Sequence, residues 1–182
     1  MKKILMIICF ACLLLEACDK AEVPSIYSGP DGINFYYDQV GPYDADPYPD
    51  ASAKGSVSAL KTTDTLYFRV DILGNLSTEI RKFALKQTTE FTEVDVSDYY
   101  VGKEVPVAGV NYIAFDDSEM EKYYEVAPDS SYVVFPVIMK YDPAKAGKKT
   151  DFLLIFELLP TEELPIMDPR FYRAMLYFTQ EN

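Results

Sequence analysis

The residue types that could do chemistry are few in this chain of 182 residues. It has no histidine, the commonest general base and metal ligand, so nucleophile systems such as the Ser-His-Asp triad are excluded. It also lacks a glycine-rich phosphate loop. Acids are plentiful, with 29 Asp and Glu against 17 Lys and Arg, so paired carboxylates remain the one open catalytic arrangement. Because none of these acids ends a predicted strand in a setting that suggests a raised pKa, we predict that the protein is not an enzyme and has no cofactor.

Two groups of acids could offer hard oxygen ligands to calcium. One is the pair Asp116 and Asp117, and the other combines Asp44 and Asp46 with Asp50. Neither group has the fixed spacing of an EF-hand loop, and solvated loop residues show the same pattern. We therefore assign no metal ligands.

The segment from Asp38 to Ser56 carries the candidate ligand-binding residues. It contains three prolines, two glycines and four aspartates, a composition typical of an exposed loop and unsuited to a packed core. Tyr43 and Tyr48 lie within it, and a tyrosine ring offers a flat apolar face to the C–H face of a pyranose. We take these two tyrosines as candidate sugar-binding residues. The alternative is a loop in which they have no such role.

The three cysteines lie near the N-terminus and indicate export. Cys9 and Cys12 belong to the apolar run Ile4–Leu15, which follows two lysines and is too short to span a bilayer. Residues 15–17, Leu-Glu-Ala, precede Cys18 and resemble the lipobox of bacterial lipoprotein signal peptidase, with glutamate in place of the usual uncharged residue. The resemblance implies cleavage before Cys18 and lipidation of its thiol. The alternative is an ordinary secretory signal.

These features divide the chain into three parts. Residues 1–17 are the export signal, residues 18–31 a polar tether with proline and glycine, and residues 32–182 one domain. Without the signal, that domain has no thiol for a disulfide or a thiolate metal site. The formal net charge of −12 argues against a nucleic-acid partner, because the phosphate backbone is also negative. The lipid at Cys18 is therefore the expected link to the membrane.

Alternation of apolar and polar residues dominates the domain. In residues 65–73 the apolar side chains of Leu66, Phe68, Val70 and Ile72 share one face, as in an antiparallel sheet with one buried side. Similar patterns predict strands at residues 33–37, 80–87, 123–126, 131–141, 151–159 and 174–179. Strands at this spacing, without helices between them, predict an all-β fold, an antiparallel Ig-like or Calx-β-like β-sandwich of about seven to eight strands.

Some patterns also predict positions within the sheets. Pro136 cannot donate to a ladder, which indicates an edge strand or a bulge. Residues 151–159 are almost all apolar, as in a central strand covered on both faces. The turn pair Gly74-Asn75 predicts that residues 80–87 return beside residues 65–73. We expect single helical turns at residues 95–100 and 109–117.

The order of these motifs resembles an uncharacterised family of Bacteroidota lipoproteins, a domain of unknown function often found beside starch-utilisation-type glycan importers. The resemblance covers residues 33–160 and rests mainly on Leu73-Gly74-Asn75 after a strand and on Ala108-Gly109-Val110-Asn111-Tyr112. The second motif is also similar to the A-G-x-D-Y element of Calx-β domains. Here Asn111 replaces the aspartate, which weakens any transfer of calcium binding.

We therefore expect a lipid-anchored protein of the cell envelope, held at the outer membrane. Its domain lies either at the cell surface or on the periplasmic face, and the sequence leaves both open. The resemblance implies a non-catalytic accessory binding module for a polysaccharide or for an outer-membrane importer complex. The alternative is a structural or adhesive protein that binds other surface proteins by strand addition at an exposed sheet edge.

Overall fold

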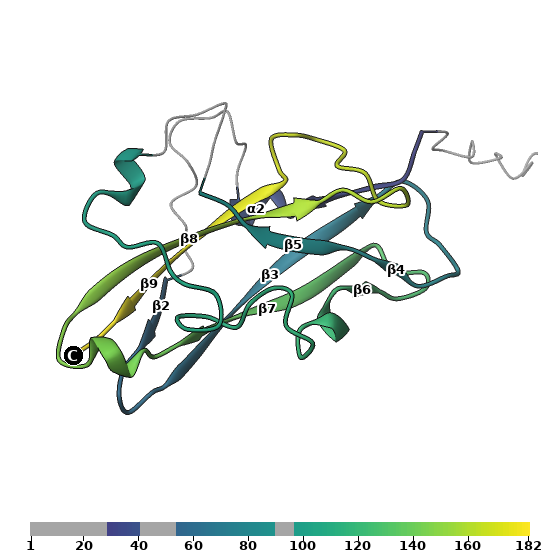
Figure 1. Ribbon diagram of the computed structural model, residues 1–182. Coiled ribbons are helices and arrows are strands. Elements are labelled where there is room, and N and C mark those ends of the chain that lie inside the picture. The colour runs from purple at the N-terminus through teal and green to yellow at the C-terminus, as the bar shows by residue number, and fades with distance from the viewer. Residues whose placement is uncertain (1–28, 41–53, 90–96) are drawn as a thin grey trace, which may run out of the picture.

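The computed structural model describes residues 29–40, 54–89 and 97–182, and most of its regular elements are strands (Figure 1). The strands are β1 (Gly32–Phe35), β2 (Lys54–Val57), β3 (Thr63–Leu73), β4 (Arg81–Lys82), β5 (Ala84–Gln87), β6 (Glu125–Val126), β7 (Tyr132–Lys140), β8 (Thr150–Leu159) and β9 (Arg173–Gln180). The short helical elements are α2 (Tyr37–Val40), η1 (Ser97–Tyr100), η2 (Glu121–Tyr123) and η3 (Pro143–Lys145). In these ranges no helix is long and apolar enough to cross a membrane.

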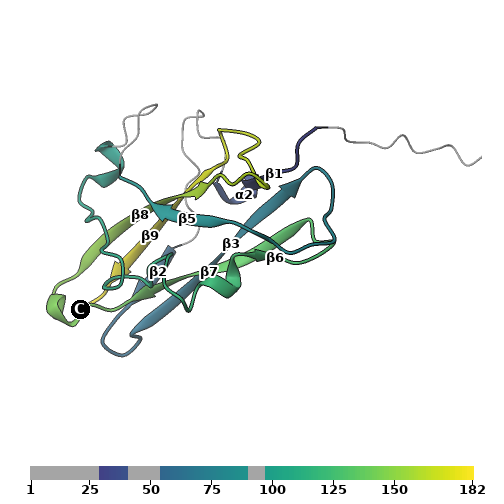
Figure 2. The same cartoon turned by 45° about the vertical axis from the view of Figure 1, so that its right-hand side comes forward.

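Two sheets form the layers of a β-sandwich (Figures 1 and 2). One has the strand order β1-β3-β7 and the other the order β2-β9-β8-β5, while β4 and β6 pair with each other. The predicted all-β sandwich is confirmed, with nine strands in the described part of the chain. One edge departs from the prediction, because β2 runs parallel to β9 with Lys54 opposite Tyr177. β1 and β2 lie in different sheets, so they do not pair with each other. β2 instead pairs with the last strand, β9, and runs in the same direction.

The core lies between the sheets and is built around Phe156 of β8. Its ring meets the rings of Phe35 and Phe68 edge-on, with centroid distances of 5.7 and 5.0 Å. The rings of Phe115 and Phe135 lie 5.1 and 6.4 Å away. These contacts join strands of both sheets, so packed aromatic side chains hold together a domain that has no disulfide.

The sequence periodicity places side chains on the predicted faces. Phe68, Val70 and Ile72 of β3 are buried, and Leu66 is half-buried against the same core. Phe68 lies opposite Phe135 of β7. β8 lies between β9 and β5, and its side chains from Phe152 to Leu158 are buried on both faces. The predictions of a one-sided strand and of a central strand are therefore confirmed.

Pro136 lies in an edge strand, as predicted. β7 ends the order β1-β3-β7. On its free side, Lys140 N–H donates to the Asn111 carbonyl at 2.7 Å, and the Ile138 carbonyl accepts from Ile113 N–H at 2.9 Å. Pro136 is an even number of residues from both, so its nitrogen faces the same side and the missing N–H removes no bond to β3.

Residues 80–87 do not return beside β3, and this prediction is wrong. β4 pairs with β6 and β5 pairs with β8, so the chain passes from one pairing to the other at the buried residue Phe83. Both edges of β3 are already occupied, by β1 and β7. Asp31 holds the connection between β3 and β4 in place. Its carboxylate accepts from Asn75 N–H at 2.7 Å and pairs with Arg81 at 3.2 Å.

Both ends of the predicted loop 38–56 belong to the fold, which corrects the prediction of one exposed loop. α2 places Val40 in the core, and β2 buries Gly55 and Val57 at the edge of the four-stranded sheet. The prolines and aspartates between them dominate the average composition and hide these short apolar ends. Residues 41–53 lie outside the described residues.

Residues 109–117 form turns, and the helical turn predicted there is absent from this described segment. Gly109 has φ of 78°, and its N–H donates to the Tyr112 carbonyl at 2.8 Å. The buried Asn111 accepts a hydrogen bond from Val107 N–H at 2.8 Å through its side-chain oxygen. The side-chain oxygen of Asn111 is thus committed to the backbone, which gives this residue a structural role. η1 confirms the other predicted turn over residues 97–100.

Candidate functional site

Strand register creates two rows of side chains on the outer face of the four-stranded sheet. Tyr177 of β9 lies between Lys54 of β2 and Leu153 of β8. The second row lies two residues farther along β9, where Thr179 is opposite Asp151 of β8 on the same outer face. The intervening residues point into the core, because side chains alternate between the faces of a strand.

The segment after η1 forms a wall along these rows. β5 pairs with β8 only from Gln87 opposite Phe156 onward, so the first half of β8 has a free edge. Glu104 takes this place, since its N–H donates to the Asp151 carbonyl at 2.9 Å and its carbonyl accepts from Leu153 N–H at 3.1 Å. This pairing fixes residues 101–103 beside the outer face.

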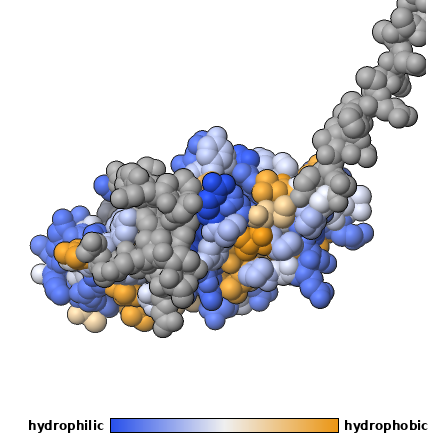
Figure 3. All heavy atoms as spheres, turned by 90° about the horizontal axis from the view of Figure 1, so that it is seen from above, coloured by the Kyte–Doolittle hydropathy of each residue, from blue (hydrophilic) through white to orange (hydrophobic). Residues whose placement is uncertain are grey.

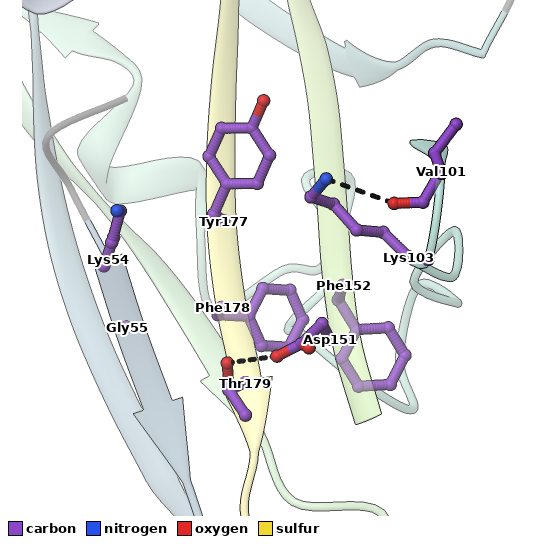
Figure 4. A pocket seen from close by; sticks show the side chains of 10 residues that line it. Lys54, Gly55, Val101, Lys103, Asp151, Phe152, Tyr177, Phe178 and Thr179 are labelled. Atoms are coloured by element: carbon purple, nitrogen blue, oxygen red, sulfur yellow. Dashed lines mark hydrogen bonds between the residues drawn. The ribbon is translucent and has the colours of Figure 1, made fainter. Parts of the chain in front are cut away.

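The wall and the sheet enclose an open hollow of about 410 Å³ (Figure 4). We call it the Tyr177 hollow, lined by Lys54, Gly55, Val101, Gly102, Lys103, Asp151, Phe152, Tyr177, Phe178 and Thr179. The Lys103 ammonium lies 5.3 Å from the centre of the Tyr177 ring and donates to the Tyr99 carbonyl at 2.9 Å. Farther along the strands, Thr179 donates to the Asp151 carboxylate at 2.6 Å.

A small apolar cluster supports one side of the Tyr177 hollow. Leu153, Ile155 and Met175 are buried on the outer face of the sheet, with Tyr99, Tyr100 and Tyr177 packed against them. The Tyr177 ring is therefore held by neighbours on rigid strands, and it remains half-buried with one part facing the hollow. A ring fixed in this way loses little conformational entropy when a ligand stacks on it.

The lining supports binding better than hydrolysis. Among the described residues that line the Tyr177 hollow, Asp151 is the one carboxylate. Glycoside hydrolysis commonly requires two carboxyl groups on either side of the scissile bond. An aromatic ring, two ammonium groups, a hydroxyl and one carboxylate instead make a set of contacts for a polar ligand with an apolar face.

Carboxylates with lowered pKa values lie in ion pairs elsewhere in the structure. The hydrogen bond from Lys145 lowers the pKa of Glu104, and the bond from Arg170 lowers that of Asp168. A general acid needs a pKa shifted in the opposite direction. Burial raises the pKa of Tyr112 to about 12, and this hydroxyl donates to Gln87. These shifts have structural causes.

The predicted site residues fall into two groups. Cys18, Tyr43 and Tyr48 lie outside the described residues, as do the three acids of segment 44–50. Asp116 and Asp117 are exposed, and Asp117 accepts from Glu119 N–H at 2.9 Å within a turn. In the described ranges, no group of three or more acidic, cysteine or histidine side chains is placed to hold a metal ion.

Sequence reasoning missed the residues of the Tyr177 hollow. Tyr177 occurs in an apolar strand where it resembles a core residue, and Lys54 falls in the segment predicted as a loop. Alternation does indicate that Tyr177 and Thr179 share a face, because they are two residues apart. The sequence carries no comparable signal for their contact with Lys103, which depends on the pairing of Glu104 with β8.

The three-stranded sheet presents a different aromatic surface. Arg69 lies between the rings of Tyr36 and Tyr132, 4.6 and 4.5 Å from their centres, and pairs with Asp71 at 2.6 Å. The guanidinium thus occupies one face of each ring. Tyr67 is 62% exposed on the same sheet and does not line the Tyr177 hollow.

A second hollow of about 350 Å³ lies beside the end of β8. It is lined mainly by apolar residues such as Leu159, Ile166 and Tyr172, and by the ion pair between Lys86 and Glu157 at 2.8 Å. Seen from above, apolar residues on the surface of the molecule form separate patches between hydrophilic areas (Figure 3). The polar groups of this second hollow are few and already paired with each other, so it suits a polar ligand less well than the Tyr177 hollow.

Comparisons with known proteins identify no family. No protein-family model matches the chain, and no curated protein does. Among solved structures, a protein of Bacteroides ovatus described as a candidate carbohydrate-binding protein is similar, with a TM-score of 0.43 and 11% identity over 81% of this chain and 36% of that chain. CBD12 of CALX1.2 has a TM-score of 0.41 and 12% identity over 82% of this chain and 44% of that chain.

A two-domain protein of unknown function from Bacteroides fragilis has a TM-score of 0.44 and 14% identity, over 84% of this chain and 46% of that chain. The chain thus spans less than half the length of each of these three structures. At these scores the likenesses establish neither a family nor a function.

Proposed function

We propose that this protein is a lipid-anchored, non-catalytic module that binds a glycan in the Tyr177 hollow. The observation that carries the proposal is the placement of one aromatic ring among convergent polar side chains on rigid strands. The volume of the Tyr177 hollow, about 410 Å³, suits a sugar unit or a short oligosaccharide.

A pyranose could use both parts of this lining. Its apolar C–H face would stack on the Tyr177 ring, while its hydroxyls would reach the ammonium groups and the Asp151 carboxylate. Because Thr179 already donates to Asp151 at 2.6 Å, the carboxylate is oriented before a ligand arrives. Preorganised polar groups lower the entropy cost of binding.

Replacement of Tyr177 tests the glycan site. We expect Tyr177→Ala to weaken binding by about tenfold, since the variant loses the stacking surface. The full chain, purified from membranes in detergent, would be screened on a glycan array, and its hits measured by isothermal titration calorimetry. Tyr67→Ala is the matched control, because Tyr67 is exposed on the opposite sheet. Equal affinity of the Tyr177→Ala variant and the unaltered chain would contradict the proposal.

The anchor at Cys18 is a separate part of the proposal, supported by the apolar signal and the lipobox-like residues before it. We expect Cys18→Ala to move the protein from the membrane fraction to the soluble fraction, because acyl chains supply most of the attachment. Fractionation and mass spectrometry of the mature N-terminus would measure this. An N-terminus without acyl chains on Cys18 argues against the anchor.

Strand addition by another surface protein remains the alternative role. At β7, contacts of Ile138 and Lys140 with residues 111–113 occupy one end of the free edge, and Pro136 removes a donor from its middle. Only a short stretch near Val134 is left for a partner strand. This favours the Tyr177 hollow as the ligand site. Cross-linking on intact cells, followed by co-purification, would reveal an importer complex or another envelope partner.

A further inference from the structure

Two cations of the Tyr177 hollow differ from most others in the structure. The chain carries a net charge of −12, and acids neutralise many of its basic side chains. Ion pairs join Lys61 to Asp64, Arg69 to Asp71, Arg81 to Asp31, Lys82 to Glu125, Lys86 and Arg173 to Glu157, Lys145 and Lys148 to Glu104, and Arg170 to Asp168. Within the described residues, Lys54 and Lys103 have no carboxylate partner, and the same is true of Lys122, Lys140 and Lys149. Of these lysines, Lys54 and Lys103 line the Tyr177 hollow.

These two lysines flank the same ring. Lys54 lies on β2 directly opposite Tyr177, and Lys103 approaches Tyr177 from the wall beside β8. β9 lies between β2 and β8, so the lysines come from opposite sides (Figure 4). Lys103 donates to the carbonyls of Tyr99 and Val101, which leaves its third N–H for a ligand. The Lys54 side chain is exposed and bonds to none of the described residues, so none of them competes with a ligand for its three donors.

We infer that the Tyr177 hollow selects a sugar that carries an anionic group, held between Lys54 and Lys103. The inference rests on the proposed function and names its ligand class. The anionic group is a carboxylate, as in a uronic acid, or a sulfate ester. Charge complementarity also sets the direction of the ligand, because Asp151 would repel the anion and accept hydroxyls at the other end of the hollow.

The rest of the molecule limits the length of the ligand. A net charge of −12 repels a long polyanion, whereas a short oligosaccharide meets mainly the two lysines. Charges farther apart than about 8 Å are largely screened at physiological ionic strength. We therefore expect short anionic oligosaccharides to bind better per sugar unit than long polymers.

The experiment compares each anionic oligosaccharide with its neutral counterpart. The probes are galacturonate and alginate oligomers with their carboxyl-reduced forms, and carrageenan oligomers with their desulfated forms. Isothermal titration calorimetry on the full chain in detergent would measure each pair. Lys54→Gln removes one cation and Lys54→Arg keeps it, while Lys122→Gln removes a lysine of η2, outside the hollow, that also has no acidic partner among the described residues.

We expect an anionic form to bind more tightly than its neutral counterpart, and Lys54→Gln to lose about fivefold in affinity for that form alone. Lys54→Arg and Lys122→Gln should retain the affinity, and added salt should weaken it. The pair that responds identifies carboxylate or sulfate as the recognised group. Neutral forms that bind as well as anionic ones, with dependence on Tyr177, would overturn this inference and leave the proposed function intact. Absence of binding to all forms would overturn both.

Discussion

The buried side chain of Asn34 joins two segments that are distant in sequence through hydrogen bonds. The amide of Asn34, 4% exposed, donates to the Asp168 carbonyl at 2.7 Å and accepts from the N–H groups of Met167 and Asp168 at 3.1 Å. One side chain thereby satisfies three backbone groups of a segment more than 130 residues away. Loss of this side chain would remove three hydrogen bonds between β1 and the half-buried segment at residues 167–168.

We predict that Asn34→Ala lowers the free energy of unfolding by about 1–3 kcal/mol, because it removes three hydrogen bonds and leaves the Asp168 N–H without a partner. The Asp168 carbonyl keeps its bond from Phe171 N–H at 3.0 Å, and the Met167 N–H keeps a longer one to the Ile33 carbonyl at 3.4 Å. Urea denaturation followed by circular dichroism would measure the change. Asn75→Ala is the control. This exposed residue loses a side-chain bond to Asp31 at 3.2 Å but keeps its backbone bond to the same carboxylate, so we expect a loss within about 0.5 kcal/mol. Coincident unfolding curves for the two variants would refute the role assigned to Asn34.

At the scale of elements, α2 covers the part of the β3 edge that the short strand β1 does not reach. β1 ends at Phe35, and beyond it the side chain of Gln39 takes the place of a strand. Its oxygen accepts from Arg69 N–H at 2.7 Å, and its nitrogen donates to the Tyr67 carbonyl at 3.1 Å. The edge of β3 is thus closed by one amide, which leaves these backbone groups of β3 unavailable to a foreign strand.

We expect Gln39→Ala to speed hydrogen exchange at the Arg69 amide and to lower the free energy of unfolding by about 1 kcal/mol. Gln39→Glu keeps the acceptor for the Arg69 N–H but loses the donor to Tyr67, so Arg69 should stay protected in that variant. Native-state hydrogen exchange followed by mass spectrometry would separate the two. If Arg69 were protected equally in the Ala variant, another group must close this edge.

At the scale of the whole molecule, ion pairs make the folding stability depend on pH in the acidic range. Partial burial alone raises the pKa of Asp64, but hydrogen bonds from Lys61, Ser56 N–H and Thr65 N–H outweigh it, so the pKa of Asp64 lies below its usual value. The pKa of Glu104 is lowered in the same direction by Lys145. A lowered folded-state pKa contributes stability above the unfolded value of about 4, which is lost as the pH falls through the folded value.

We therefore predict that the melting temperature falls as the pH is lowered from about 5 to about 3. Asp64→Asn should melt lower than the unaltered chain at neutral pH and show a shallower acid dependence, because the titrating group is gone. Glu163→Gln is the control, since Glu163 is exposed and has no ion pair among the described residues. Thermal unfolding measured at several pH values would decide, and identical acid slopes for Asp64→Asn and the unaltered chain would contradict the assignment.

Local patterns were sufficient for much of the fold. Alternation along β3 and β7 identified the buried faces, the apolar run of β8 identified a central strand, and Pro136 indicated an edge. These features depend on neighbours within a few residues, since a strand exposes alternate side chains to alternate environments. The export signal and the lipidation of Cys18 are also local patterns, and they remain predictions.

Pairing between distant strands was decided only in three dimensions. β2 joins β9 more than 100 residues later, and Glu104 pairs with β8 where β5 leaves an edge free. Which edges stay free depends on every other strand, so no short window of sequence contains that information. The Tyr177 hollow arises from these two pairings. Its lysines, ring and carboxylate are scattered along the chain, and their meeting is a property of the tertiary structure.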